Sequence, residues 1–410
     1  MNASAKELAA NFDLEKLTAE FYDDPYPTYR ALRENEPVKR LPNGTVFLTR
    51  YDDLVTAYKN TKSFSSDKKR EFAPKYGDTP LYEHHTTSLV FNDPPAHTRV
   101  RRLIMGALSP RAIAGMESDI VKLVDGLLDA IAAKGHCELI ENFAASIPIE
   151  VIGNLLDVPH DERAPLRDWS LAILGALEPV VSPDVAARGN KAVTDFLAYL
   201  QTLVARRRAK PGNPERDVLT RLIQGEGHGE DNGERLTEKE LLHNCIFLLN
   251  AGHETTTNLI GNGLVALDRN PDQKQRLIDN PELIKIAVEE MLRYESSNQL
   301  GNRMTTERVE LGGVALEAGT SVTLCIGAAN RDPAQFPAPE SFDVARTPNR
   351  HLAFATGAHQ CAGMALARLE GAIAISRFLA RFPNYAVSGQ PVRGGRVRFR
   401  GFLSVPCAIG

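Results

Sequence analysis

The feature that most constrains the fold is a long, mostly apolar stretch between a helix start signal and a helix stop signal. Thr237 and Glu240 form the T-x-x-E pattern of a capping box. Asn270 precedes Pro271, and the helix ends there because the residue before a proline avoids the helical conformation. About thirty residues at a rise of about 1.5 Å each would span roughly 45–50 Å. We therefore predict one helix that crosses the whole protein through its core.

The middle of this helix contains residue types that disfavour a helix interior. Residues 251–258 read A-G-H-E-T-T-T-N. Gly252 and three consecutive β-branched threonines are weak helix formers, and a buried carboxylate at Glu254 is costly. Such local conflicts in a core often mark a functional site. A polar stripe at the surface, with threonine hydroxyls bonded back to helix carbonyls, explains the run equally well.

The rest of the chain predicts a mainly α protein with small β-sheets at one side, an α+β fold. The clearest candidate helices are Ser118–Ala133, Pro165–Leu177, Asp184–Arg207, Pro281–Tyr294 and Gly363–Arg381. Short β-type runs occur at Val46–Thr49, Val309–Leu311 and Ser321–Cys325, with a further pair at Val397–Arg400 and the C-terminus. No Ser/Gly-rich linker divides the chain, so we expect a single domain over 1–410 with an N-terminal extension over about residues 1–20.

Charge and cysteine usage exclude several classes of protein. A net charge of −4 gives no overall support for a nucleic-acid or anionic-membrane partner. The five cysteines are widely spread, with no C-x-x-C pair, which argues against a disulfide framework and a structural zinc site. We find neither an apolar signal segment within Met1–Phe21 nor a run of about 18 apolar residues. These features predict a cytoplasmic protein without a membrane anchor.

The strongest chemical signal is a glycine-flanked cysteine before an amphipathic helix. Residues 351–363 read H-L-A-F-A-T-G-A-H-Q-C-A-G, with Cys361 between Gly357 and Gly363. The glycines let the backbone approach a flat cofactor, and a helix N-terminus stabilises a thiolate. A buried, inert cysteine is the alternative. A zinc site that used His359 and Cys361 would lack two further ligands at suitable spacing.

This loop resembles the haem loop of the cytochromes P450. The pattern F-x-x-G-x-H-x-C-x-G is matched by Phe354, Gly357, His359, Cys361 and Gly363. The family usually has a second glycine after the phenylalanine, where this chain has Ala355. The resemblance implies the cytochrome P450 fold, a single triangular haem domain with a long central helix. It also implies haem b as cofactor, with Cys361 as the ligand of the iron.

Further family motifs follow in the family's order, and the resemblance covers roughly Phe21 to the C-terminus. Glu290 and Arg293 match the E-x-x-R helix, whose ion pair is structural in this family, although E-x-x-R alone is common on solvated helix faces. The arginine that many relatives carry before Phe342 is absent. Arg346 could take its place as the third member of the network.

The resemblance also assigns a group of basic residues to the two haem propionates. These are His97 and Arg101 in the D-P-P-A-H-T-R-V-R segment, Arg303, and His359 in the haem loop. Arginine suits the planar fork of a carboxylate. Ordinary surface ion pairs are the alternative for such residues.

The threonine-rich centre of the long helix is similar to the family's acid–alcohol segment over the oxygen site. The resemblance implies that Thr255 hydrogen-bonds dioxygen and a water, and that Glu254 relays protons from solvent. Gly252 would leave room where the helix ladder opens. His253 and Glu254 also begin the zinc-protease pattern H-E-x-x-H, but its fifth position is Thr257, so the second histidine is absent.

The function implied by the resemblance is monooxygenation, in which one oxygen atom from O2 enters a small, mostly apolar substrate by hydroxylation or oxidative dealkylation. Electrons would come from NAD(P)H through a separate ferredoxin and its reductase. The ferredoxin would dock on a basic proximal face near Arg99, Arg102 and Arg368, and we expect a monomer. A peroxide-driven peroxygenase, an O2-independent isomerase, and a haem-based sensor or ligand carrier remain alternatives. The Glu254–Thr255 pair argues against the first two.

Family positions also outline a substrate pocket, whose expected residues are Leu89, Phe247, Asn250, Ala251, Asn298, Leu300 and Phe402. Most are apolar, as expected for a small-molecule pocket. The amides of Asn250 and Asn298 would lack partners beside a pure hydrocarbon, at a cost of about 1–3 kcal/mol each. They therefore favour a compact, partly aromatic or alicyclic substrate with a carbonyl, hydroxyl or carboxyl group. No arginine in these segments is an obvious carboxylate clamp, which favours a neutral oxygen group; amides bonded to backbone or water are the alternative.

Overall fold

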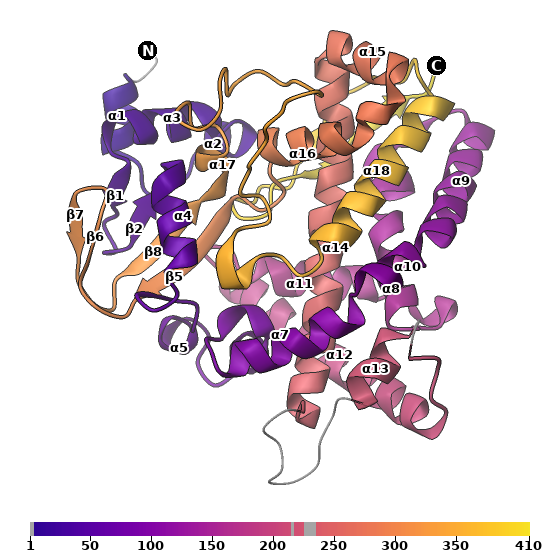
Figure 1. The fold of residues 1–410 in the computed structure, drawn as a ribbon, viewed down its shortest axis with the longest axis horizontal. Helices are drawn as coiled ribbons and strands as arrows, with labels where there is room; N and C mark the ends of the chain where they lie inside the picture. The colour runs from indigo at the N-terminus through magenta and orange to yellow at the C-terminus, as the bar shows by residue number, and fades with distance from the viewer. Residues whose placement is uncertain (1–3, 215–216, 225–234) are drawn as a thin grey trace.

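The predicted long helix is helix α14, over Glu238–Arg269, in a computed structural model that describes residues 4–214, 217–224 and 235–410. Both hydrogen bonds of the capping box between Thr237 and Glu240 are present. Helix α14 runs through the middle of the molecule (Figure 1). Its N-terminal part packs in one hydrophobic cluster around Ile246, and its C-terminal part packs in another around Leu264. The polar run therefore lies between two cores.

The other five predicted helical segments are confirmed to within a few residues. They form α9 (Glu117–Lys134), α11 (Leu166–Gly175), α12 (Pro183–Ala209), α16 (Ile284–Tyr294) and α18 (Met364–Arg381). A 3-10 turn over Pro281–Leu283 precedes α16. The further helices are α1 (Ala5–Ala10), α2 (Ala19–Asp23), α3 (Tyr26–Asn35), α4 (Tyr51–Lys59), α5 (Lys69–Tyr76), α6 (Pro80–Thr87), α7 (Ala96–Ala107), α8 (Pro110–Ala114), α10 (Ser146–Leu155), α13 (Val218–Gln224), α15 (Pro271–Asp279) and α17 (Ile326–Ala329).

The main sheet lies to one side of α14, beside the N-terminal helices (Figure 1). Its order is β1 (Val38–Arg40), β2 (Val46–Leu48), β8 (Ser321–Cys325), β5 (Leu300–Thr305) and β3 (Phe64–Ser65). Strands β2 and β8 pair in parallel, and the other neighbours are antiparallel. The smaller sheets contain β4 (Cys137–Glu138), β12 (Pro406–Ala408) and β9 (Ala386–Val387); β10 (Val392–Arg393) and β11 (Phe402–Ser404); and β6 (Val309–Leu311) and β7 (Val314–Leu316).

The prediction of a strand over Val397–Arg400 is wrong. This segment contributes one isolated bridge, between Phe399 and Asn298. The backbone N–H groups of Val397 and Arg398 donate to the carboxylate of Glu178, at 2.9 and 3.2 Å, instead of to a neighbouring strand. The segment is therefore an extended loop held by the Glu178 side chain and by two backbone bonds, in which the N–H of Gln299 donates to Arg398 O at 2.8 Å and the N–H of Arg400 donates to Ser297 O at 2.9 Å.

The segment before residue 20, expected to be an extension, packs on the body of the protein. Helix α1 lies against α3 (Figure 1). The Phe12 ring lies 5.9 Å from that of Phe21 and 5.0 Å from that of Phe47 on β2. These residues belong to the hydrophobic cluster behind the main sheet.

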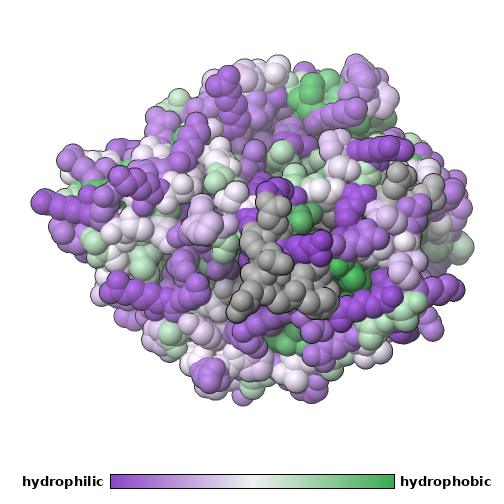
Figure 2. All heavy atoms as spheres, turned by 60° about the horizontal axis from the view of Figure 1, so that its bottom comes forward, coloured by the Kyte–Doolittle hydropathy of each residue, from purple (hydrophilic) through white to green (hydrophobic). Residues whose placement is uncertain are grey.

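Hydrophilic residues predominate in Figure 2, where hydrophobic residues form small, separate patches. Within the described residues, every helix is too short or too polar to cross a lipid bilayer.

Candidate functional site

A cavity of about 330 Å³ lies beside the polar middle of α14. Its walls come from segments that are far apart in the sequence, namely α6, α7, α11, α14, β5, the loop before α18 and the C-terminal loop. Cys361 and Thr255 both line it. The fold therefore brings the predicted cysteine ligand and the predicted alcohol to one cavity.

Cys361 lies in a backbone loop that ends at the N-terminus of α18. Its N–H donates to the carbonyl of Phe354 at 2.9 Å. Gly357 has φ +77°, and a Cβ there would lie 2.7 Å from the carbonyl oxygen of Tyr58, so this position requires glycine. The Cys361 side chain is open to the cavity. Burial raises the pKa of its thiol, while the backbone N–H of Gly363 opposes that shift.

Ala355 stands where the family usually has its second glycine, and its backbone shows the consequence. Its φ is +54°, in the left-handed region. A side chain there costs about 1–2 kcal/mol because the Cβ approaches the following carbonyl oxygen. The loop keeps its conformation despite this cost, since the N–H of Ala355 donates to Leu352 O at 2.8 Å.

The four residues predicted to hold the propionates meet at the cavity wall. The rings of His97 and His359 stack with centroids 3.8 Å apart, and Arg101 and Arg303 line the cavity beside them. Burial lowers the pKa of His97 to about 4 and that of His359 to about 3, and the neighbouring arginines add to both shifts.

This basic cluster lacks carboxylate partners among the described residues. Arg101 donates to Gln360 O at 2.7 Å, and Arg303 donates to Asn302 O at 2.7 Å. The Nε2 atoms of His97 and His359 and the Nε of Arg303 are buried with no partner in the described chain. Buried cations are normally paired with anions. Two carboxylates entering the cavity would satisfy these donors, so the residues present fit a haem with its two propionates.

Glu254 forms an ion pair that the sequence did not predict. Nη1 of Arg396 lies 2.6 Å from Oε1 and 2.7 Å from Oε2 of Glu254. Burial raises the pKa of Glu254 to about 7, and Arg396 opposes that shift. The partners are 142 residues apart, and no spacing motif connects them. The hydroxyl of Thr255 donates to Ala251 O at 2.7 Å, as in the alternative interpretation of this run.

Gly252 does not mark an opening of the helix, contrary to expectation. Helix α14 is continuous through it. A Cβ at this position would lie 2.2 Å from Cδ1 of Ile152 on α10. The glycine therefore permits close packing of α10 on α14, next to the cavity that both residues line.

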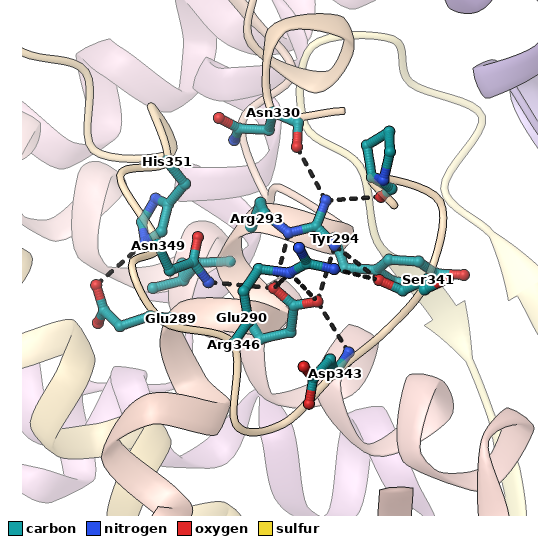
Figure 3. Close-up of polar contacts among 12 residues, drawn as sticks. Glu289, Glu290, Arg293, Tyr294, Asn330, Ser341, Asp343, Arg346, Asn349 and His351 are labelled. Carbon is teal, nitrogen blue, oxygen red and sulfur yellow. Dashed lines mark hydrogen bonds and ion pairs between the residues drawn. The ribbon is translucent and has the colours of Figure 1, made fainter. Parts of the chain in front are cut away.

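Glu290 and Arg293 form a fully buried ion pair on α16 (Figure 3). Arg293 donates from Nε and Nη2 to the two carboxylate oxygens at 2.7 and 2.8 Å. Arg346 approaches the same oxygens from Nε at 3.1 and 3.0 Å. Ser341 contributes only its carbonyl oxygen, which accepts from both arginines at 3.0 Å. Arg346 therefore occupies the place of the missing third member.

Comparisons with known proteins identify the family. The family model for cytochrome P450 matches residues 177–392. The chain is a cytochrome P450. It is 35% identical over 370 residues to the biotin biosynthesis cytochrome P450 of Bacillus subtilis (strain 168), covering 90% of this chain and 91% of the relative. It is 37% identical over 387 residues to the cytochrome P450 monooxygenase PikC of Streptomyces venezuelae, covering 92% and 89%.

Solved structures give the same result. The structure of P450BioI in complex with hexadec-9Z-enoic acid-ligated acyl carrier protein has a TM-score of 0.89 at 34% identity, covering 96% of this chain and 100% of that one. The predicted fold class, family and enzyme class are confirmed. This cytochrome P450 is a haem-dependent monooxygenase that uses O2 and electrons derived from NAD(P)H to oxidise a small organic substrate.

Six of the seven residues expected in the substrate pocket of this cytochrome P450 line the cavity; they are Leu89, Phe247, Asn250, Ala251, Asn298 and Leu300. Phe402 does not, because it starts strand β11 and packs in the core, with its ring 4.0 Å from the guanidinium of Arg393. Phe399, in the loop before β11, lines the cavity in its place. The aromatic residue that reaches the cavity therefore comes from the loop before β11 and not from β11 itself.

The cavity also contains polar groups that the family positions did not indicate. His84, His85, Lys68 and Arg398 line it, so an arginine does reach the cavity, although no arginine in the predicted pocket segments was an obvious carboxylate clamp from the sequence. Both amide atoms of Asn250 are buried and lack a partner among the described residues. The alternative in which the Asn250 amide bonds to backbone is therefore absent from this structure.

Proposed function

We propose that Cys361 binds the haem iron and that His97, Arg101, Arg303 and His359 hold the propionates. The observation that carries this proposal is the buried group of basic side chains beside Cys361 that have no carboxylate partner in the described chain. Charge-assisted hydrogen bonds to carboxylates are the strongest that such donors make. When bound, haem supplies the oxygen-activating chemistry of the family. Phe354 and Gly363 complete the binding loop in this proposal.

Glu254 and Thr255 are proposed to manage protons over the cavity. A carboxyl group whose pKa lies near 7 can accept and release a proton at neutral pH. The Thr255 hydroxyl already donates to Ala251 O, so its oxygen is left to accept a hydrogen bond from a water in the cavity. Once the ion pair between Glu254 and Arg396 opens, the Glu254 carboxyl group can pass a proton to that water.

Electrons are proposed to come from a separate ferredoxin and its reductase, which dock near the N-terminus of α18. Of the three arginines suggested for the docking surface, two already form ion pairs with glutamates. Arg99 donates to Glu240, and Arg368 donates to Glu289 at 2.7 and 2.8 Å. Exposed residues on this face mainly steer encounter. The proposal also includes a single monomeric domain and a cytoplasmic location.

The test begins with the ferrous carbon-monoxide complex. Wild type is expected to show the red-shifted thiolate Soret band, and Cys361→Ala or Cys361→His is expected to lose it. NADH consumption with a ferredoxin and its reductase, coupled to product formation, is expected to separate a monooxygenase from a sensor or a peroxygenase. An unchanged thiolate band in Cys361→Ala would overturn the ligand assignment.

A further inference from the structure

The cavity contains a second group of basic side chains besides those near Cys361. His85 and Arg398 both line it. His85 comes from α6 and Arg398 from the loop before β11, whereas Arg101 comes from α7 and Cys361 from the loop before α18. The second group therefore occupies a different part of the cavity wall.

Lys68 also lines the cavity. Its own charge is neutralised by Glu71, whose Oε2 lies 2.6 Å from the Lys68 Nζ. Lys68 therefore adds no net charge to the second group, and Arg398 remains its principal cation toward the cavity.

The guanidinium of Arg398 is held rigidly by neutral groups. Nε donates to Leu177 O at 3.0 Å, Nη1 donates to Leu300 O at 2.8 Å, and Nη2 donates to Oδ1 of Asn302. These three bonds use three of the five N–H donors of an arginine. The remaining donors and the positive charge are available to a group in the cavity.

Neighbouring arginines of the same segment are matched by carboxylates, and Arg398 is not. Arg396 pairs with Glu254 at 2.6 Å, and Arg400 pairs with Glu295 at 2.5 Å. No ion pair of Arg398 occurs among the residues that the structure describes. The Glu178 carboxylate reaches the backbone N–H of Arg398 rather than its guanidinium.

His85 provides a second, independent observation. It is 1% exposed, and its ring packs against those of Phe72, Tyr76 and Phe91 at 5.5, 5.4 and 5.7 Å. Its Nε2 atom is buried and has no hydrogen-bond partner within the described chain. Such an unpaired polar atom costs about 1–3 kcal/mol. Since His85 lines the cavity, a ligand there can supply the missing partner.

We infer that the substrate is a carboxylic acid with an apolar body, whose carboxylate is bound by Arg398 and Nε2 of His85. The fork of an arginine matches a carboxylate, and the Nε2–H tautomer of His85 donates to it. The apolar body lies along Leu174 and Phe247, which line the same cavity. This inference rests on the proposed function and specifies the substrate class for its site.

The experiment compares matched acids and alcohols in holoenzyme. Dodecanoic acid is paired with dodecan-1-ol, and 4-phenylbutanoic acid with 4-phenylbutan-1-ol. Affinity is measured by calorimetry and by the Soret shift that accompanies displacement of water from the iron. Arg398→Gln removes the charge, Arg398→Lys retains it, and Arg308→Gln is the control because Arg308 is an exposed surface residue. The thiolate band of each variant reports the proposed function separately.

We expect an acid to bind wild type more tightly than its alcohol. Arg398→Gln is expected to weaken acid binding about 10- to 100-fold, as expected for a charged hydrogen bond, and to change alcohol binding less than about twofold. Arg398→Lys is expected to restore part of the loss, and Arg308→Gln to leave both ligands unaffected. Equal losses for acid and alcohol, unchanged acid binding in Arg398→Gln, or no acid binding by wild type with an intact thiolate band would each overturn the inference.

Discussion

Replacing Arg346 by methionine tests whether this residue completes the buried network around Glu290. The substitution removes a side chain that is 10% exposed and approaches both oxygens of a carboxylate that is 0% exposed. Arg293 still balances the charge of Glu290, so the expected loss is one charge-assisted hydrogen bond, about 1.5–3 kcal/mol. The carbonyl partners of Arg346 at Pro337 and Ala338 lie near the surface, where water can replace it.

This free energy converts into a measurable melting shift. With about 2.1 cal/mol/K per residue, the unfolding entropy of a chain this long is roughly 0.9 kcal/mol/K, which gives a loss of about 2–3 °C in Tm. Far-UV circular dichroism on holoenzyme of equal haem content measures it. Arg276→Met is the control, because Arg276 and Asp343 form an ion pair with 46% and 42% exposed side chains, worth about 0–1 kcal/mol.

A double-mutant cycle with Glu290→Gln isolates the contact itself. Once the carboxylate is replaced by an amide, Arg346→Met is expected to cost less than it does in wild type. A single-variant Tm equal to that of the Arg276→Met control would refute the argument. The argument would also be refuted if the two substitutions changed the free energy of unfolding by strictly additive amounts.

Three further predictions concern the loop and the proton groups. Thr255→Ala is expected to uncouple NADH oxidation from product formation, with peroxide released, because the water held by the hydroxyl is lost; product per NADH unchanged from wild type would contradict this role. Arg396→Gln is expected to move the limb of the pH–rate profile that reports Glu254 to higher pH. The reason is that Arg396 opposes the rise of the pKa to about 7 caused by burial, so its removal further favours the protonated form; Glu254→Gln is the control, which should abolish that limb. Ala355→Gly is expected to stabilise the holoenzyme by about 0.5–1 kcal/mol in denaturant unfolding, since relief of left-handed strain exceeds the added unfolded-state entropy; a destabilised variant would show that the loop bears no strain at φ +54°.

Local signals allowed much of the fold to be predicted. The capping box at Thr237 and the proline after Asn270 set the ends of α14, because such signals act within one helical turn. The cysteine loop was equally readable, since Gly357, His359, Cys361 and Gly363 are close neighbours along the chain. The failed prediction over Val397–Arg400 has the opposite cause. A carboxylate from Glu178, more than two hundred residues away, accepts from the N–H groups of Val397 and Arg398, so the regular strand pairing is limited to one bridge at Phe399.

The sequence by itself determined the family, the cofactor and the cysteine that is proposed to bind it, because the family motifs are short and their residues are close neighbours along the chain. Tertiary structure alone decided which charges meet. Arg396 reaches Glu254 across 142 residues, and Arg346 reaches Glu290 across 56. Arg398 lines the cavity only because the loop before β11 packs against α14 and β5 in the folded chain. The physical reason is that an ion pair depends on the distance between two charges in space. That distance is set by how elements far apart in the sequence pack together, so a local sequence pattern cannot predict it.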